Sequence, residues 1–194
     1  MSCTMPIKNR GELKKFTGYY SEVKENRRNH ALLMTGLNTA LRISDILILK
    51  WEDVYSFENE KFHGHICIRE KKTGKINMIP INMELKEELK SYGEAVGIEK
   101  GKYLFRSRKG YNQPLSRSQA FRIVKEAAGY AECEDNIGCH SLRKTFGYMA
   151  WNMGASVTVL MEIFNHSSYS VTRRYLGIGQ CEKDEIYMNM HEFR

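Results

Sequence analysis

Helical patterns of hydrophobic and polar positions cover most of this chain. They predict helices over Asn9 to Lys24, Arg28 to Leu41, Met83 to Val96, Ser116 to Ala128, Ser141 to Met153, Ser156 to Phe164, Tyr169 to Tyr175 and Glu182 to Glu192. Asn82 is suited to cap the helix that starts at Met83, and Ser44-Asp45 offers an N-cap to a further short helix through Leu49. The chain is therefore expected to be mostly helical.

The middle of the chain changes its period. Residues 65–69 (HICIR) and 75–81 (KINMIPI) alternate between polar and apolar positions, as strands do. The segment Lys72-Thr73-Gly74 between them has the composition of a turn, so the two strands are predicted to pair as a hairpin. The expected fold class is α+β, mostly helical, with one small antiparallel sheet whose hairpin carries Lys72.

Size and composition fit one domain in a reducing compartment. The chain has 194 residues, of which 42% are hydrophobic, enough to bury a core. Its longest uncharged apolar run, Ile46 to Leu49, is far too short to span a bilayer, and the N-terminus lacks the apolar stretch of a secretion signal. The five cysteines are an odd set without a C-x-x-C pair, which favours reduced thiols and a cytoplasmic location.

Positive charge is in excess and is unevenly distributed. Lys and Arg number 30 against 23 Asp and Glu, for a net charge of +7. The basic segments are Arg69–Lys75, Lys100–Arg108, Arg117–Lys125 and Arg143–Lys144, and the acidic ones are Glu84–Glu94 and Glu182–Glu192. If the basic segments gather on one face of the molecule and the acidic ones on another, the basic face would suit a phosphate-rich ligand. Many proteins that bind no nucleic acid are nevertheless as basic as this one.

Several charged residues allow both a functional and a structural interpretation. His140 and Arg143 lie three apart at a predicted helix start, where they could hold two oxygens of one phosphate or be a core histidine and a surface arginine. Lys72 at the hairpin tip could protonate a leaving oxygen or be merely solvated. Arg42 lies close to the core between two apolar runs, where Asp45 one turn later could form a structural salt bridge with it.

Motifs for metals, nucleotides and serine nucleophiles are not found in the sequence. The spacing of Cys133, Cys139 and His140 does not suit a metal site, and His63 and His65 fall where a strand begins. There is no G-x-x-x-x-G-K-[ST] and no G-x-S-x-G. We therefore expect neither a metal nor a cofactor.

Considered together, six residues suit the chemistry of a phosphodiester: Arg42, Lys72, His140, Arg143, His166 and Tyr175. Because the transition state of strand transfer concentrates negative charge on the non-bridging oxygens, positioned cations can do the work of a metal. Tyr175 follows His166 by nine residues, and its phenol could attack phosphorus to form a covalent phosphotyrosyl ester. Tyr169, only three residues after His166, and Tyr187, in an acidic tail, are weaker candidates for the nucleophile.

The order of these motifs resembles the tyrosine recombinases, also called the phage integrase family. The motifs are TGLNTALRISDILILKW with Arg42, KKTGK with Lys72, HSLRKTF with His140 and Arg143, and NHSSYSVTRRYLG with His166 and Tyr175. Each is weak alone, but four in this order at these separations are highly specific. The resemblance covers almost the whole chain and implies a tyrosine recombinase catalytic domain.

The resemblance implies a set of phosphate ligands. Arg42 and Arg143 would bind the scissile phosphate, and His166 would donate a hydrogen bond to it. Asp45 matches an acidic position that steadies the site in the family, which agrees with its interpretation as a salt-bridge partner of Arg42.

The resemblance also implies the proton transfers and the covalent step. Lys72 would protonate the leaving 5′ oxygen, and His140 would act as a base or as a further phosphate ligand. Tyr175 would attack to give a 3′-phosphotyrosine.

Two features depart from the family pattern. Asn165 stands where family members usually carry Gly. After Gly, Asn is the residue that best tolerates a positive φ, so the turn is expected to survive.

Typical members also carry a separate N-terminal helical domain that completes a clamp around DNA, whereas only 41 residues precede Arg42 here. We expect residues 1–194 to be a single catalytic domain with a tail helix over about 180–194 and no separate N-terminal DNA-binding domain. Such a chain is either a minimal recombinase, similar in size to the invertases that switch fimbrial promoters, or an isolated domain.

The expected function is a site-specific DNA recombinase of the integrase, invertase or resolvase type, with double-stranded DNA as its partner. One alternative is a DNA-binding protein on the same fold that does not cleave, although such a protein needs no tyrosine nucleophile. Another is a type IB topoisomerase-like relaxing enzyme, which acts alone.

The predicted tail helix bears on the choice between these functions. Ile186, Met190 and Phe193 form one apolar stripe on a helix too short to stand alone in water. The stripe must dock on its own domain or, as often in the family, on a neighbouring protomer. We expect a monomer or weak dimer without DNA, a tetramer on paired DNA sites, and no membrane association.

Overall fold

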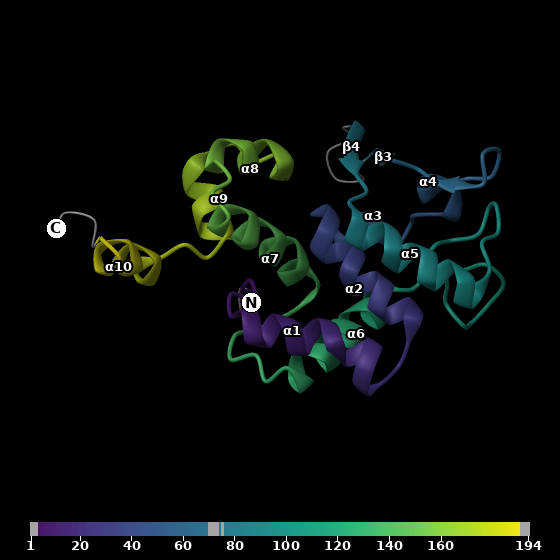
Figure 1. The fold of residues 1–194 in the computed structure, drawn as a ribbon, viewed down its shortest axis with the longest axis horizontal. Coiled ribbons are helices and arrows are strands. Elements are labelled where there is room, and N and C mark those ends of the chain that lie inside the picture. The colour runs from purple at the N-terminus through teal and green to yellow at the C-terminus, as the bar shows by residue number, and fades with distance from the viewer. Residues whose placement is uncertain (1–3, 70–73, 75, 191–194) are drawn as a thin grey trace.

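The computed structural model describes residues 4–69, 74 and 76–190, and helices dominate it. Helix α2 (Arg27–Thr39) runs through the centre and packs against α5 (Met83–Val96) on one side and α7 (Cys139–Asn152) on another (Figure 1). Helices α1 (Arg10–Gly18) and α6 (Arg117–Tyr130) lie against each other below them. The predicted α+β class, mostly helical with a small antiparallel hairpin, is confirmed.

Capping residues explain why most helices begin where the sequence predicts. Asn9 and Asn82 accept backbone hydrogen bonds at the starts of α1 and α5, and Ser116 and Gln119 form a reciprocal capping box at the start of α6. Beyond Gly18, α1 continues into a π-helix over Tyr19–Val23. The segment predicted as one helix to Lys24 is therefore helical to Val23, but its last turn is a π-helix.

The predicted hairpin is present as β3 (His65–Arg69) and β4 (Ile76–Pro80), paired antiparallel with His65 opposite Pro80 and Arg69 opposite Ile76. Alternation works as expected on β3, because Ile66 and Ile68 face the core while the residues between them are exposed. The tip of the hairpin, with Lys72, lies outside the described residues.

One short helix was predicted in the wrong place. Helix α3 covers Ile43–Ile46, so it starts before Ser44 and does not reach Leu49. Its N-cap is Arg42, whose extended backbone presents a carbonyl that accepts from the amides of Asp45 and Ile46. Ser44 is therefore inside the helix rather than at its cap.

Short elements after α3 were not predicted. Helix α4 (Trp51–Val54) is followed by a two-residue ladder between β1 (Tyr55–Ser56) and β2 (Lys61–Phe62). Elements of this length carry too few positions to display a period. Helix α7 also begins two residues before the predicted Ser141.

A second hydrophobic cluster lies under the C-terminal helices α8 (Val157–Phe164) and α9 (Tyr169–Tyr175). It is built from Ala40, Leu160, Phe164 and Leu176, separate from the main core around α2. Gly147 of α7 lets these helices approach closely, because a Cβ there would stand 2.5 Å from side-chain atoms of Phe164 and Leu176. The two helices are thus seated on α7 next to the end of α2.

The tail helix α10 (Gln180–Met188) has its first turn held against the N-terminal segment through the buried Glu182, and beyond that turn it projects away from the rest of the molecule (Figure 1). Helix α10 ends at Met188, short of the predicted Glu192, so Met190 lies beyond the helix that was expected to carry it. Ile186 and Met190 are 61% and 54% exposed and do not dock on their own domain. Phe193 lies outside the described residues. None of the helices described, α10 included, is long and apolar enough to cross a membrane.

Candidate active site

Arg143 is the structural centre of the candidate site. It lies in the second turn of α7, and its side chain is buried, with 3% of the residue exposed. The guanidinium donates one hydrogen bond to the carbonyl of Ala40 and another, of 3.1 Å, to the carbonyl of Phe164. These carbonyls lie at the C-terminal ends of α2 and α8, where the helix dipoles favour a positive charge. Arg143 therefore ties two helix ends together.

Two residues with left-handed backbone shape these helix ends. Asn165, the C-cap of α8, has φ 53°, which confirms that the turn survives without Gly. Ala40, the C-cap of α2, has φ 54°, a conformation that costs an alanine about 1 kcal/mol. Strain of this kind is kept when the surroundings determine the conformation, and here the carbonyl of Ala40 is the one that Arg143 binds.

Arg42 follows two residues after this strained turn. It is half-buried, and its positive charge acts to lower the pKa of both His166 and Tyr175, so it lies within electrostatic range of them. Asp45 is fully buried three residues further along. A salt bridge between Arg42 and Asp45 stays a prediction.

His166 is fixed by Thr172. Its Nδ1 atom lies 2.9 Å from the Thr172 hydroxyl, a fully buried group of α9. Burial lowers the pKa of His166, and the charges of Arg143 and Arg42 lower it further. The imidazole is therefore neutral at neutral pH, since its pKa falls below the ordinary value of about 6.5.

Tyr175 is the last residue of α9. Its ring packs edge-on against the ring of His166, with 4.8 Å between the centroids, and its centroid lies 5.1 Å from that of the Phe164 ring. Burial raises the pKa of Tyr175, while the charge and a hydrogen bond of Arg143 and the charge of Arg42 oppose the rise. The phenol is thus protonated at neutral pH and faces the two cations that would stabilise its anion.

The other two tyrosines near the C-terminus lie in different surroundings. Tyr169 at the start of α9 is 58% exposed, and Tyr187 in α10 is 79% exposed. Neither ring packs against the two arginines, so among these three tyrosines the geometry favours Tyr175.

The structure brings together four of the six predicted site residues, namely Arg42, Arg143, His166 and Tyr175. His140 is exposed at the second position of α7, one turn before Arg143. Lys72 lies outside the described residues, so its placement stays a prediction.

Two neighbours of the site were not predicted. Lys144 is buried, with its Nζ 5.1 Å from the centroid of the Tyr175 ring, and it donates a 2.6 Å hydrogen bond to the carbonyl of Thr4. Its position directly after Arg143 was a signal, although charge alone could not tell a buried lysine from a solvated one. Thr172 lies within the motif that contains His166 and Tyr175, but threonines inside helices are too common to single out.

The N-terminal segment also supports the site. The Ile7 amide donates to the Thr145 hydroxyl of α7 at 2.8 Å, and Lys8 Nζ donates to the carbonyl of Gly177 at 2.7 Å. Lys8 also forms an ion pair with Glu182, a nearly buried residue in the first turn of α10. We call this contact the Lys8–Glu182 clip. It connects the two ends of the chain just beyond Tyr175.

Comparisons with known proteins agree on one family. The model of the phage integrase family matches residues 10–179. The probable integrase/recombinase YoeC of Bacillus subtilis (strain 168) is 38% identical over 180 residues, which are 93% of this chain and 93% of that protein. Tyrosine recombinase XerA of Pyrococcus furiosus is 32% identical over 80% of this chain and 52% of its own length, so the chain spans about half of that relative.

Solved structures share the fold at low sequence identity. The crystal structure of XerA recombinase superimposes with a TM-score of 0.76 at 21% identity, covering 96% of this chain and 64% of the other. XerH site-specific recombinase, in a post-cleavage complex with palindromic difH substrate, gives a TM-score of 0.74 at 21% identity, covering 99% of this chain and 55% of the other.

Proposed function

The chain belongs to the phage integrase family, and on this premise we propose that it is a site-specific DNA recombinase that acts through a 3′-phosphotyrosyl intermediate. The observation that carries the proposal is the position of Tyr175, edge-on against His166 and within the field of Arg143 and Arg42. A phosphate placed at this position would meet cations on one side and a nucleophile on the other.

Tyr175 would attack the phosphorus of the scissile phosphodiester. A bond forms between the phenol oxygen and phosphorus, and the bond from phosphorus to the 5′ oxygen breaks. Because burial raises the pKa of Tyr175, the phenol needs a base, and His140 would take its proton. Lys72 would give a proton to the departing 5′ oxygen. In the second step a 5′-hydroxyl attacks the phosphotyrosine, which rejoins the DNA and restores the phenol.

His166 would act as a hydrogen-bond donor rather than a cation. The Thr172 hydroxyl has one proton, which it can donate to Nδ1 of His166 at 2.9 Å or to the Ser168 carbonyl at 3.5 Å. When it donates to the closer Nδ1, the proton of the neutral ring resides on Nε2, from which it can be donated to a phosphate oxygen. Arg143 would add its remaining N–H groups and its charge to the same phosphate. Electrostatic stabilisation of this kind is usually the largest single contribution to catalysis.

Double-stranded DNA would be the substrate, and the cytoplasm the place of action. We propose that the single catalytic domain is a monomer or weak dimer by itself and a tetramer on paired sites, with the exposed face of α10 docked on a neighbouring protomer. A DNA-binding protein without cleavage would have no use for the arrangement around Tyr175. A relaxing enzyme that acts alone would have no use for an undocked tail helix.

Recombination in the presence of EDTA tests the function. Inverted repeats around a short spacer in the DNA that flanks the gene supply the candidate site. Because Arg42 and Arg143 can neutralise the phosphate, we expect exchanged strands and a covalent protein–DNA adduct to persist when divalent metals are chelated. Binding to the repeats without any adduct would favour the non-cleaving alternative, and relaxation of supercoils without exchange would favour the relaxing enzyme.

Lys72 is expected to be the leaving-group acid of the hairpin. Replacing it by Ala should slow single-turnover cleavage by about 10²-fold or more, because positioned proton donors contribute on this scale. Lys71→Ala and Lys75→Ala remove the same charge from the same hairpin and serve as controls. Equal losses in all three variants would mean that these lysines act only as a basic patch.

Removal of the tail should separate binding from recombination. Deleting residues 182–194 is expected to abolish strand exchange on paired sites while single-site DNA binding remains, because it removes the exposed face of α10. Gel-shift and recombination assays on the same preparation measure both. The deletion also removes Glu182 of the Lys8–Glu182 clip, so Glu182→Gln in the full chain is the control and should still exchange strands. Normal recombination by the truncated chain would rule out a role for the tail in assembly.

The Lys8–Glu182 clip should respond to acid. Burial tends to raise the pKa of Glu182, but hydrogen bonds from Lys8 and from the Gly179 amide outweigh it and hold the pKa below its ordinary value. The clip therefore stabilises the fold above the unfolded pKa of about 4.3 and is lost as pH falls through the lower folded value. Glu182→Gln should lower the melting temperature at pH 7, and the difference from the parent chain should shrink as the pH falls below the unfolded pKa of about 4.3.

A further inference from the structure

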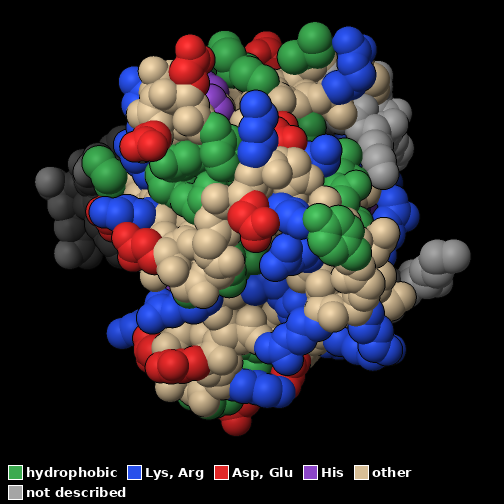
Figure 2. All heavy atoms as spheres, turned by 90° about the vertical axis from the view of Figure 1, so that its right-hand side faces the viewer, with side chains coloured by type: hydrophobic (Ala, Val, Ile, Leu, Met, Phe, Trp, Pro, Cys, Tyr) green, Lys and Arg blue, Asp and Glu red, His purple; other side chains and the backbone are tan. Residues whose placement is uncertain are grey.

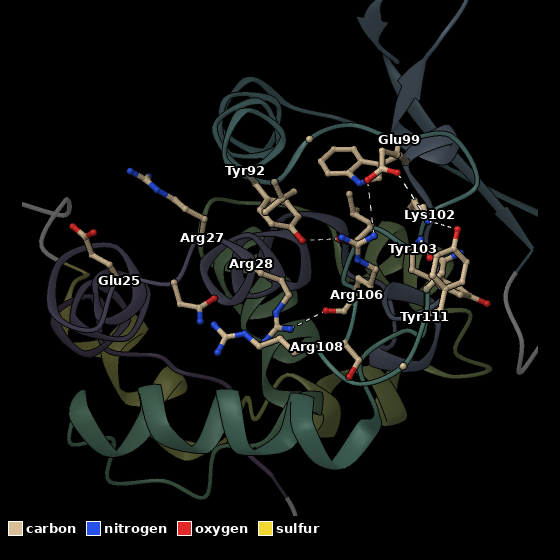
Figure 3. A pocket seen from close by; sticks show the side chains of 18 residues that line it. Glu25, Arg27, Arg28, Tyr92, Glu99, Lys102, Tyr103, Arg106, Arg108 and Tyr111 are labelled. Carbon is tan, nitrogen blue, oxygen red and sulfur yellow. Dashed lines mark hydrogen bonds and ion pairs between the residues drawn. The ribbon is translucent and has the colours of Figure 1, made fainter.

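A cavity of about 610 Å³ opens at the N-terminal end of α2, between the end of α5 and the loop over residues 99–112 (Figure 3). Helix α2 has 13 residues, so this cavity is about 20 Å from Arg42 at the other end of the helix. It contains none of the residues assigned to strand cleavage. Figure 2 shows the face of the molecule on which it lies, where Lys and Arg side chains gather in the lower half of the view.

The lining of the cavity is strongly cationic. It includes five basic side chains, Arg27, Arg28, Lys102, Arg106 and Arg108, against two carboxylates, Glu25 and Glu99. Glu99 is within 4.0 Å of Arg106 and 3.9 Å of Lys102, so this carboxylate is shared by two cations. Arg27, Arg28 and Arg108 also line the cavity, and none of them forms an ion pair with a carboxylate among the residues that the structure describes.

Arg28 is a partly buried cation of this cavity, and no described carboxylate pairs with its charge. It is half-buried, and its hydrogen bonds go to neutral groups, the carbonyl of Arg106 at 2.8 Å and the Asn29 side chain at 3.1 Å. It forms no ion pair with any residue that the structure describes. Burial lowers the pKa of Arg28, and the nearby charge of Arg108 lowers it further. A half-buried arginine that is repelled by a second arginine is stabilised when an anion binds between them.

The loop that carries Arg106 and Arg108 is held in place. Besides the bond from Arg28, the Ser107 amide donates to the carbonyl of Gln113 at 2.7 Å, and Tyr92 donates to the carbonyl of Leu104 at 2.8 Å. In Figure 3, Arg28, Arg106 and Arg108 lie together in the middle of the view, with Tyr103 and Tyr111 beside them. Fixed guanidinium groups match the oxygens of a phosphate well.

We propose that this cavity is a second phosphate-binding site, distinct from the catalytic one, centred on Arg28 and Arg108. Its ligand carries a phosphate group, which belongs either to the DNA backbone outside the cleavage point or to a free phosphate compound such as a nucleotide. At about 3.4 Å per base pair, a distance of 20 Å corresponds to roughly six base pairs of flanking duplex. The site extends the proposed function without depending on it, since phosphate binding can be measured in the absence of DNA.

The first arm of the test uses the full chain without DNA and inorganic pyrophosphate as the probe, measured by calorimetry at low salt. We expect saturable binding that Arg108→Gln weakens at least about tenfold, equivalent to about 1.4 kcal/mol. Arg108 is exposed and makes no hydrogen bond with any described residue, so its replacement should leave the fold intact. Lys109→Gln is the matched control, because Lys109 is exposed on the same loop but does not line the cavity.

The second arm compares DNA duplexes that share the cleavage site but carry short or extended flanks. If the ligand is the DNA backbone, extended flanks bind more tightly, and Arg108→Gln reduces the salt dependence of binding by about one counterion on the extended duplex only. Pyrophosphate binding without this flank effect identifies a free phosphate compound as the ligand. Absence of both effects, or equal losses in Arg108→Gln and Lys109→Gln, overturns the proposal, whatever the outcome of the recombination assay.

Discussion

Replacing Tyr175 by Phe is expected to eliminate the covalent protein–DNA adduct. The variant lacks only the phenol oxygen, and the ring that packs on Phe164 and His166 remains, so the fold should be preserved. Loss of a nucleophile costs far more than loss of an auxiliary donor, and we expect a decrease of about 10⁴-fold or more in single-turnover cleavage. A DNA substrate with a nick beside the cleavage point traps the adduct, because the released fragment diffuses away before it can rejoin.

Tyr169→Phe and Tyr187→Phe are the matched controls. Each removes one hydroxyl from an exposed tyrosine close to Tyr175 in sequence, and each should form adduct at the normal rate. DNA binding by all three variants should equal that of the parent chain. An adduct in Tyr175→Phe that disappears in one of the other two variants would move the nucleophile to that residue.

Local signals made much of the fold predictable. Asn82 was predicted as a cap, and Asn9 and Ser116 were predicted as helix starts; all three have side chains that bond to the first amides of their helices. The hairpin was visible because alternation on β3 places its two isoleucines on one face. Each of these features depends on interactions within a few residues.

Interactions between distant residues were not predictable in the same way. Lys8 and Glu182 are 174 positions apart and form a clip whose partners look like ordinary charged residues in the sequence. The left-handed backbone of Ala40 has no sequence signal, because alanine favours a helix and the turn is determined by the packing around it. The start of α3 at Ile43 depends likewise on the extended backbone of Arg42, which overrides the capping preference of Ser44.

The same contrast separates the members of the candidate site. His166 and Tyr175 lie close in sequence, and their approach follows from one turn and one short helix. Arg42 and Arg143 are brought to them by tertiary structure; their shared suitability for a phosphodiester and the resemblance of ordered motifs linked these positions in advance, whereas no local pattern could. The cavity around Arg28 had no such motif: the segment Lys100–Arg108 was visible as basic, but nothing in the sequence indicated that it packs beside Arg28.

Replacing Arg143 by Ala is expected to impair both folding and cleavage. The variant leaves the carbonyls of Ala40 and Phe164 without this buried donor, and an unsatisfied buried group costs about 1–3 kcal/mol. It also removes a charge that acts on Tyr175, so cleavage should fall by about 10³-fold, the loss seen when a positioned donor to a transition state is deleted. Thermal unfolding followed by circular dichroism and single-turnover cleavage well below the transition measure the two effects separately.

Arg143→Lys distinguishes charge from geometry. Lysine keeps the positive charge, but one ammonium cannot bridge two helix ends and bind a phosphate at the same time, whereas the planar guanidinium has five N–H groups for these tasks. We therefore expect Arg143→Lys to recover part of the stability and to remain at least about 10²-fold slower in cleavage, with DNA binding little changed. Full activity of the lysine variant would contradict this account, because it would mean that charge alone suffices and that the fork between Ala40 and Phe164 does not position the phosphate ligand.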